Sequence, residues 1–177
     1  MSLETRPSFT ARLWHFGERV LRAVEHLQPL AQFAARLYVG AAFFRSGLTK
    51  LRDWDTTLAL FGDEYKVPLL DPATAAVLGT AGELVLPVLL VLGLGGRFAA
   101  LGLSVINVVA VISLAEIAEA ALQGHVFWGS LLAALVLWGP GRWSLDRWVV
   151  PALRHRALGA VAHEGARYTA QASLPHR

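Results

Sequence analysis

The sequence predicts an all-α membrane protein, built as an antiparallel bundle of four transmembrane helices with an N-terminal amphipathic helix. The chain has 177 residues, of which 55% are hydrophobic and only 16% are charged. Its mean hydropathy of +0.47 is too high for a soluble domain of this length. Apolar segments of about 20 residues, the length that crosses a bilayer, recur along the chain. Short stretches rich in Gly, Pro and Asp separate these segments and indicate turns.

Residues 9–27 form the predicted amphipathic helix, within an N-terminal segment (1–28) that we assign to the cytoplasm. Their apolar residues recur at three- and four-residue steps, with arginines between them. This pattern is typical of a helix in the lipid headgroup region, and a helix packed on a partner protein would look the same. We favour the membrane surface because a spanning helix follows directly. The segment has no continuous apolar core before a small-residue cleavage site, so we expect no removable signal peptide.

The four-helix bundle is predicted over residues 29–141, and its first span carries a stripe of polar and small residues. The stripe falls on one face of a helix, and its glycines allow a second helix to approach closely. The stripe consists of Arg36, Gly40, Phe43, Gly47 and Lys50. The four predicted spans are about 29–51, 73–95, 98–118 and 120–139.

Capping signals place the segments between and after the spans. Asp71 is the predicted N-cap of the second span and Pro72 its first residue, where no backbone donor is needed. The acidic stretch 52–71 has apolar residues at helical spacing, which predicts a short amphipathic helix at the mouth of the bundle. Residues 142–177 are predicted to form a cytoplasmic amphipathic helix, capped by Ser144, and then a flexible tail.

Basic residues indicate the topology. They concentrate in the N-terminal segment, in the glycine-rich turn that contains Arg97 and in the C-terminal segment. Because cytoplasmic segments carry the excess of Lys and Arg, both termini are expected in the cytoplasm.

Several kinds of chemistry are excluded. The chain has no cysteine, so it has no disulfide, thiolate metal site or iron–sulfur cluster. It has no nucleotide-binding motif, no HExxH and no nucleophile elbow. Only His125 lies near a span, so no pair of histidines can hold a haem. His125 with Glu116 and Glu119 is too loosely spaced to indicate a metal site, and we assign none.

A candidate polar site lies inside the predicted membrane region. Glu83 is near the centre of the second span, where an unpaired charge costs several kcal/mol. Its first-choice partner is Arg36 and its second is Arg45, although Arg45 could instead extend toward the headgroups. Asn107 lies at similar depth and suggests a hydrogen bond between helices, and Lys50 completes the set. The site could be a structural ion pair, a proton or anion site, or the polar end of a pocket for an amphiphile such as a quinone.

Three stretches together resemble a known family: RLYVGAAFFRSGLTKL (36–51), GELVLPVLLVLGLGGRFAALGL (82–103) and WGPGRWSLD (138–146). They are similar to the DoxX family of small bacterial four-helix inner-membrane proteins, in particular its proteobacterial branch, over about 36–148. The resemblance implies a location in the bacterial inner membrane. It provides no catalytic residue, and the recurring polar positions of the family fall on Arg36, Lys50, Glu83, Arg97 and Asp146.

Members of that family include a subunit of an archaeal thiosulfate:quinone oxidoreductase and proteins linked to oxidative stress or metal handling. The resemblance therefore implies an accessory subunit of a membrane redox or stress system, with a quinone-like molecule bound near Glu83. Whether the chain is an enzyme stays open, because it has no self-contained catalytic motif. The alternatives are a non-enzymatic anchor or assembly factor and, last, a small-solute or proton transporter, for which four spans leave little room. We expect the chain to contact the lipid bilayer and other proteins of a membrane complex, and not nucleic acid. A homo-oligomer is compatible with the sequence.

Overall fold

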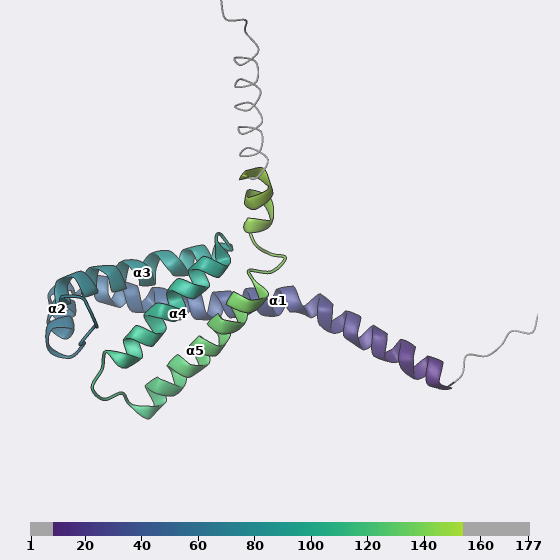
Figure 1. Cartoon of the computed structure of the whole chain (residues 1–177), viewed down its shortest axis with the longest axis horizontal. Helices are drawn as coiled ribbons and strands as arrows, with labels where there is room; N and C mark the ends of the chain where they lie inside the picture. Colours follow the sequence, from purple (N-terminus) through teal and green to yellow (C-terminus); the bar gives the residue numbers. More distant parts are fainter. Residues whose placement is uncertain (1–8, 154–177) are drawn as a thin grey trace, which may run out of the picture.

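The computed structural model describes residues 9–153, and every regular element within them is a helix (Figure 1). The predicted flexible tail lies outside the described residues. The helices are α1 (Phe9–Arg52), α2 (Trp54–Asp63), α3 (Pro72–Leu92), α4 (Gly96–Ile112) and α5 (Glu119–Trp138), and a further helix begins at residue 146 and continues to 153.

The long helices form a closed ring. Helix α1 packs against α3 and α5, and α4 packs against the same two helices from the other side. Helix α2 packs against α1 and α3 and lies across one end of the bundle, called here the α2 end (Figure 1). The core contains side chains from all four helices of the ring: Val39, Phe43, Leu90, Ala99, Ala100, Leu103, Leu132 and Leu135.

The helices of the bundle present apolar side chains outward. Helices α3 and α5 are long and apolar enough to cross a membrane, yet only 33% and 11% of their most apolar windows are buried inside the protein. Helix α4 is a shorter apolar helix with exposed Leu101, Val105 and Val108. An apolar outer surface is unfavourable in water and suits contact with lipid, so the fold is that of a helical membrane protein.

The glycine stripe of α1 meets another helix, as predicted, and that helix is α3. A Cβ atom at Gly40 would be 2.8 Å from Val91 Cγ2, and one at Gly47 would be 2.9 Å from Leu84 Cγ. These distances are too short for any side chain, so glycine is what allows the two backbones to approach. The contact also fixes the antiparallel register of α1 and α3, which places Gly47 beside Glu83.

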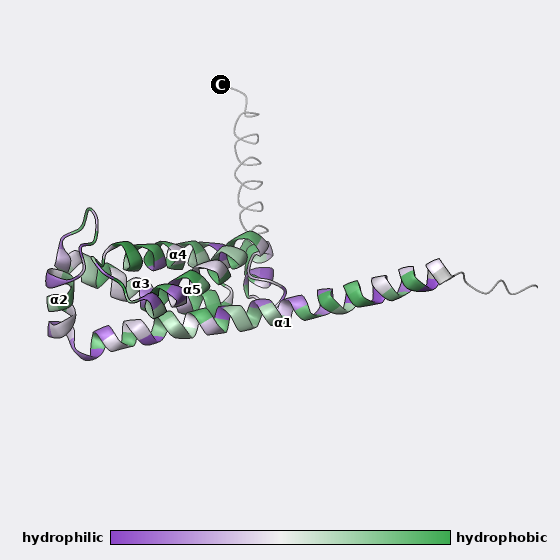
Figure 2. Ribbon diagram, turned by 90° about the horizontal axis from the view of Figure 1, so that it is seen from below, coloured by the Kyte–Doolittle hydropathy of each residue, from purple (hydrophilic) through white to green (hydrophobic). Residues whose placement is uncertain are grey.

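Helix α1 continues through the boundary predicted at residue 28. It is a single helix of 44 residues with Pro29 inside it. Proline removes one backbone hydrogen bond, but Pro29 is buried and the helix does not end there. Figures 1 and 2 show the N-terminal part of α1 extending past the bundle, at the end opposite α2. In this part hydrophobic and hydrophilic residues alternate (Figure 2), and its large apolar side chains are exposed, including Leu13, Phe16, Val20 and Val24.

The capping predictions had mixed outcomes. Asp71 Oδ1 accepts a hydrogen bond of 3.0 Å from Thr74 N, with Pro72 in the first turn, as predicted. Asp53 caps α2 in the same way through Thr56 N. Hydrogen bonds from the side chain and the backbone of Thr74 lower the pKa of Asp71, and hydrogen bonds from the backbone and the side chain of Thr56 lower that of Asp53. Ser144 does not cap the final helix: among the described residues no backbone N–H donates to its hydroxyl, which itself donates to the carbonyl of Gly141.

The third predicted span ends earlier than expected. Helix α4 stops at Ile112, whereas the sequence predicted a span to about residue 118. The backbone carbonyl of Ser113 accepts a hydrogen bond of 2.8 Å from Lys66 N in the α2–α3 loop. This contact uses an acceptor that the next helical turn would need, so the chain leaves the helix at Ser113.

Candidate functional site

A cavity of about 460 Å³ opens among the helices near the α2 end. Its volume falls in the range of small-molecule sites. Side chains from all the helices α1 to α5 line it, and most are apolar, including Phe43, Phe61, Leu78, Ile106 and Trp128. The polar residues on its wall are Ser46, Lys50, Tyr65, Glu83, Ser113 and His125.

The principal polar feature of the cavity is an ion pair between α1 and α3. Lys50 Nζ lies 2.6 Å from Glu83 Oε2 and 2.9 Å from Oε1, and it also donates to Ser46 Oγ at 2.9 Å. The Glu83 side chain is 9% exposed and that of Lys50 is 20% exposed. Glu83 therefore faces the protein interior, as predicted, and the ammonium group neutralises its charge.

Arg36 is not the partner of Glu83, contrary to the prediction. It is fully buried, and its guanidinium donates to the carbonyl of Leu90 at 3.5 Å and to the carbonyl of Trp143. It also lies 5.4 Å from the centre of the Phe33 ring. The reason is the register: Lys50 is about 21 Å further along α1 than Arg36, so antiparallel packing brings Lys50 to Glu83 and Arg36 to the end of α3.

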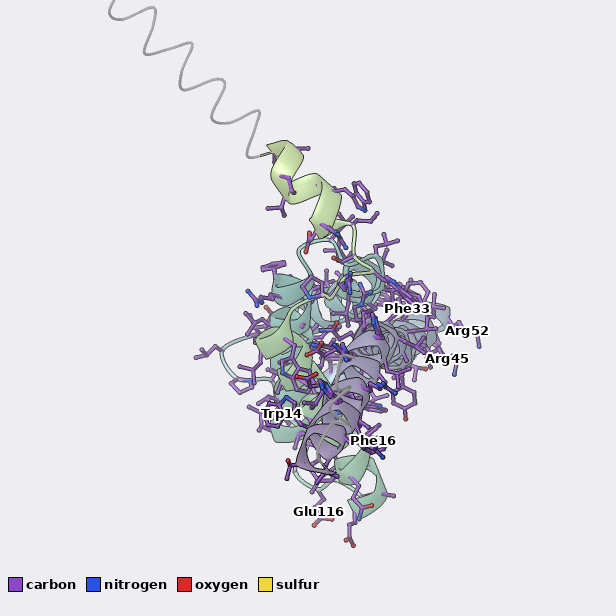
Figure 3. All side chains as sticks on the ribbon, turned by 90° about the vertical axis from the view of Figure 1, so that its right-hand side faces the viewer. Trp14, Phe16, Phe33, Arg45, Arg52 and Glu116 are labelled. Atoms are coloured by element: carbon purple, nitrogen blue, oxygen red, sulfur yellow. The ribbon has the colours of Figure 1, made fainter. Side chains whose placement is uncertain are left out.

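Arg45, the second predicted partner, lies outside the site. Its side chain is exposed, and Figure 3 shows it with Arg52 on the outer side of α1. In the described part of the chain its guanidinium has no hydrogen-bond partner, and Thr49 Oγ1 donates to its backbone carbonyl. This position agrees with the alternative stated for Arg45, in which the side chain extends away from the bundle.

Asn107 links α4 to α5, as the sequence suggested, through two hydrogen bonds to His125. Asn107 Nδ2 donates to the backbone carbonyl of His125 at 2.9 Å, and Asn107 Oδ1 is 2.9 Å from His125 Nδ1. The backbone carbonyl of His125 fixes the orientation of the Asn107 amide group. If the amide were turned over, its oxygen would face the carbonyl oxygen and no hydrogen bond could form. Oδ1 can only accept a hydrogen bond, so Nδ1 of His125 carries the proton and Nε2 of the neutral ring is an acceptor.

The free nitrogen of His125 is available to a ligand. In the described residues, Nε2 has no hydrogen-bond partner. Among the described residues, the enclosed side-chain nitrogens and oxygens without a partner are Arg36 Nε and Thr80 Oγ1. Nε2 of His125 is not one of these enclosed atoms, so it is accessible. His125 lines the cavity and packs edge-on against Trp128, with ring centres 5.2 Å apart. His125 thus places a hydrogen-bond acceptor at the cavity wall, on the α5 side.

Tyr65, in the loop after α2, adds a donor. Burial, followed by the negative charges of Glu83 and Glu64, raises the pKa of the Tyr65 phenol. The hydroxyl therefore stays neutral and protonated at physiological pH. For the stretch 52–71 that contains Tyr65, the sequence predicted only a short amphipathic helix, because nothing local indicates that the loop after this helix folds back over the bundle.

Within residues 9–153, no three His, Cys, Asp or Glu side chains are grouped closely enough to hold a metal ion. His125 is engaged with Asn107. Glu116 is exposed and lies at the periphery of the molecule (Figure 3).

Comparison with known families identifies the central part of the chain. The family model of DoxX matches residues 31–116. The chain belongs to the DoxX family. The comparisons with curated proteins and with solved structures gave no significant match.

The DoxX match includes Lys50, Tyr65, Glu83 and Asn107, and it ends before α5 begins. The ion pair and most of the cavity therefore lie in the DoxX segment, whereas His125 is contributed from outside it. Chemically, the cavity combines an apolar body with an ammonium and a phenol as donors and a carboxylate and an imidazole nitrogen as acceptors. Such an arrangement can bind and orient a small amphipathic molecule and exchange protons with it.

Proposed function

We propose that this DoxX protein crosses the bacterial inner membrane four times and binds a quinone-like molecule in the cavity near Glu83, as an accessory subunit of a membrane redox system. The observation that carries the proposal is the Lys50–Glu83 ion pair on the wall of a mostly apolar cavity of about 460 Å³. A buried charge pair is often no more stabilising than apolar packing. Its position on a cavity wall supports a ligand-binding role.

The donors and acceptors suit such a head group. A quinone has two carbonyl oxygens that accept hydrogen bonds, and the hydroxyl of Tyr65 is a donor on the cavity wall. The Lys50 ammonium already makes three hydrogen bonds, to Glu83 and Ser46, so it donates to a quinone by exchanging one of them. The reduced form has two hydroxyl groups, and Glu83 and His125 Nε2 can accept hydrogen bonds from them. The rings of Phe43, Phe61 and Trp128 supply apolar and aromatic contact for the ring.

The chain would bind and orient the molecule and move protons, while a partner supplies electrons. Reduction of a quinone to a quinol consumes two electrons and two protons. The sequence has no cysteine and no nucleotide motif, so the electrons would come from a redox protein that binds this subunit. The Glu83 carboxylate and the Lys50 ammonium both lie on the cavity wall, where they would exchange protons with the head group.

The membrane arrangement follows from the basic residues, with both termini in the cytoplasm. In this orientation the α2 end faces the periplasm. Reporter fusions after Asp63 and at the C-terminus test it: we expect a periplasmic signal at Asp63 and a cytoplasmic signal at the C-terminus. A cytoplasmic signal at Asp63 would overturn the topology.

The binding proposal is tested by identifying the bound small molecules. The protein is purified with its native lipids, and the extract is analysed for wild type, Glu83→Gln, Lys50→Met and the control Arg45→Gln, which changes an exposed charge outside the cavity. We expect wild type and the control to retain a quinone and the two cavity variants to lose most of it. Equal retention in all four proteins would refute the assignment of the site.

The exposed apolar residues on the projecting part of α1 favour a second function, a non-enzymatic anchor or assembly factor. In that case Phe16→Ser and Val20→Ser would abolish cellular function, while Glu83→Gln would preserve it. An empty cavity in wild type together with full function of Glu83→Gln would favour the anchor over the quinone site.

A further inference from the structure

A second cavity of about 780 Å³ lies at the end of the bundle opposite α2. The turn between α3 and α4, the segment after α5 and a short part of α1 surround it. Three arginines, Arg97, Arg142 and Arg147, are on its wall. This cavity shares no lining residue with the one that contains Glu83.

The arginines of this second cavity are not neutralised within the described part of the chain. None of them lies within 4.0 Å of a carboxylate there. The single acid on the wall is Asp146, and both of its oxygens are engaged: Oδ1 accepts from Gly95 N at 2.8 Å and Oδ2 from Gly96 N at 2.9 Å. The Asp146 carboxylate therefore balances the partial positive charge that the backbone N–H groups carry at the start of α4. Arg97 Nη2 donates to the backbone carbonyl of Leu137 at 3.4 Å, and the charges of the three guanidinium groups remain available to another anion.

Apolar side chains flank the charged cavity. Phe98, Leu137 and Trp138 are 68%, 75% and 67% exposed, and Phe98 and Trp138 belong to the cavity wall. Tryptophan is enriched at the membrane interface, where one part of the ring is in contact with acyl chains and another with headgroups. A ligand that fits both features has an anionic head and an apolar tail.

We propose that this cavity binds the phosphate headgroup of an anionic phospholipid from the cytoplasmic leaflet. Arginine binds phosphate oxygens through paired N–H donors, and basic pockets between helices on the cytoplasmic side are suited to anionic headgroups. The acyl chains lie along Phe98 and Leu137. The assignment rests on the proposed membrane orientation, which the reporter fusions test separately, and it is independent of the ligand near Glu83.

The test measures lipid binding to the full chain in phosphatidylcholine nanodiscs that contain increasing fractions of phosphatidylglycerol. The variant is Arg97→Gln/Arg142→Gln/Arg147→Gln. The control, Arg45→Gln/Arg52→Gln/Lys66→Gln, removes the same charge from exposed positions at the α2 end. Retained lipid is counted by native mass spectrometry, and the melting temperature is measured in parallel.

We expect wild type and the control to retain phosphatidylglycerol and to melt at higher temperature as its fraction rises. The arginine variant should lose affinity by about tenfold or more. Equal loss in the control would show a general surface-charge effect and overturn the site. An equal rise in melting temperature with inorganic phosphate alone would overturn the lipid assignment. If the triple variant does not fold, the three single variants give the same comparison.

Discussion

Removal of one partner of the Lys50–Glu83 ion pair should destabilise the protein far more than removal of both. In Lys50→Met the Glu83 carboxylate stays 9% exposed and loses its donor at 2.6 Å. An uncompensated buried charge of this kind costs about 3–5 kcal/mol. For a chain of this size, that corresponds to a fall in melting temperature of roughly 10 °C. Glu83→Gln should cost less, because the Lys50 side chain is 20% exposed and its ammonium can reach solvent.

The double variant Lys50→Met/Glu83→Gln leaves no charge at the site, so it should recover much of the stability that Lys50→Met loses. The assay is thermal unfolding in detergent of wild type, both single variants and the double variant, analysed as a double-mutant cycle. We expect a coupling of about 2 kcal/mol or more. Additive effects of the two substitutions, with a coupling below about 0.5 kcal/mol, would refute the statement that the two charges neutralise each other in the folded protein.

Four further predictions concern single positions. Gly47→Ala should destabilise by about 1–3 kcal/mol, because a Cβ meets α3, whereas Gly17→Ala, with open space around it, should be neutral or stabilising. Both are checked by thermal unfolding in detergent. Arg36→Met should cost about 2–5 kcal/mol in the same assay, because the carbonyls that accept from Arg36 lose a charged donor; an unchanged melting temperature would contradict this. Asn107→Leu should release the His125 ring and reduce the retained quinone, as measured by extraction, while preserving the helix content by circular dichroism. The folded-state pKa of Asp71 is lowered, so its cap stabilises the protein fully above the unfolded pKa, about 3.9, and the contribution is lost as the pH falls through the folded pKa. The acid limb of a stability profile should therefore be flatter in Asp71→Asn, and identical limbs would show that the cap does not contribute.

Local signals in the sequence were sufficient for much of the fold. The glycine stripe predicted which face of α1 meets another helix, and Asp71 with Pro72 predicted the start of α3 because a cap depends only on neighbouring residues. The inward orientation of Glu83 followed from the cost of a charge in lipid. Each of these inferences needs only the position of a residue along one helix.

The partner of Glu83 could not be found in the same way. Depth along a straight helix placed Arg36 and Arg45 at similar distances from Glu83, on opposite sides of it. The position of Arg36 on the glycine stripe then favoured Arg36. The contact between Gly47 and α3 sets the register instead, and the register selects Lys50. The orientation of His125 depends in addition on a hydrogen bond between two helices, and no pattern within α5 indicates it.

The continuity of α1 has a mechanical consequence. At about 1.5 Å per residue, its 44 residues form a rod of about 66 Å, roughly twice the thickness of the hydrocarbon core of a bilayer. Phe16 and Lys50 are therefore about 50 Å apart on one element. A contact made at the projecting end is therefore far from the ammonium group that faces Glu83, and Pro29, where a backbone hydrogen bond is missing, is the position between them at which the helix bends most easily.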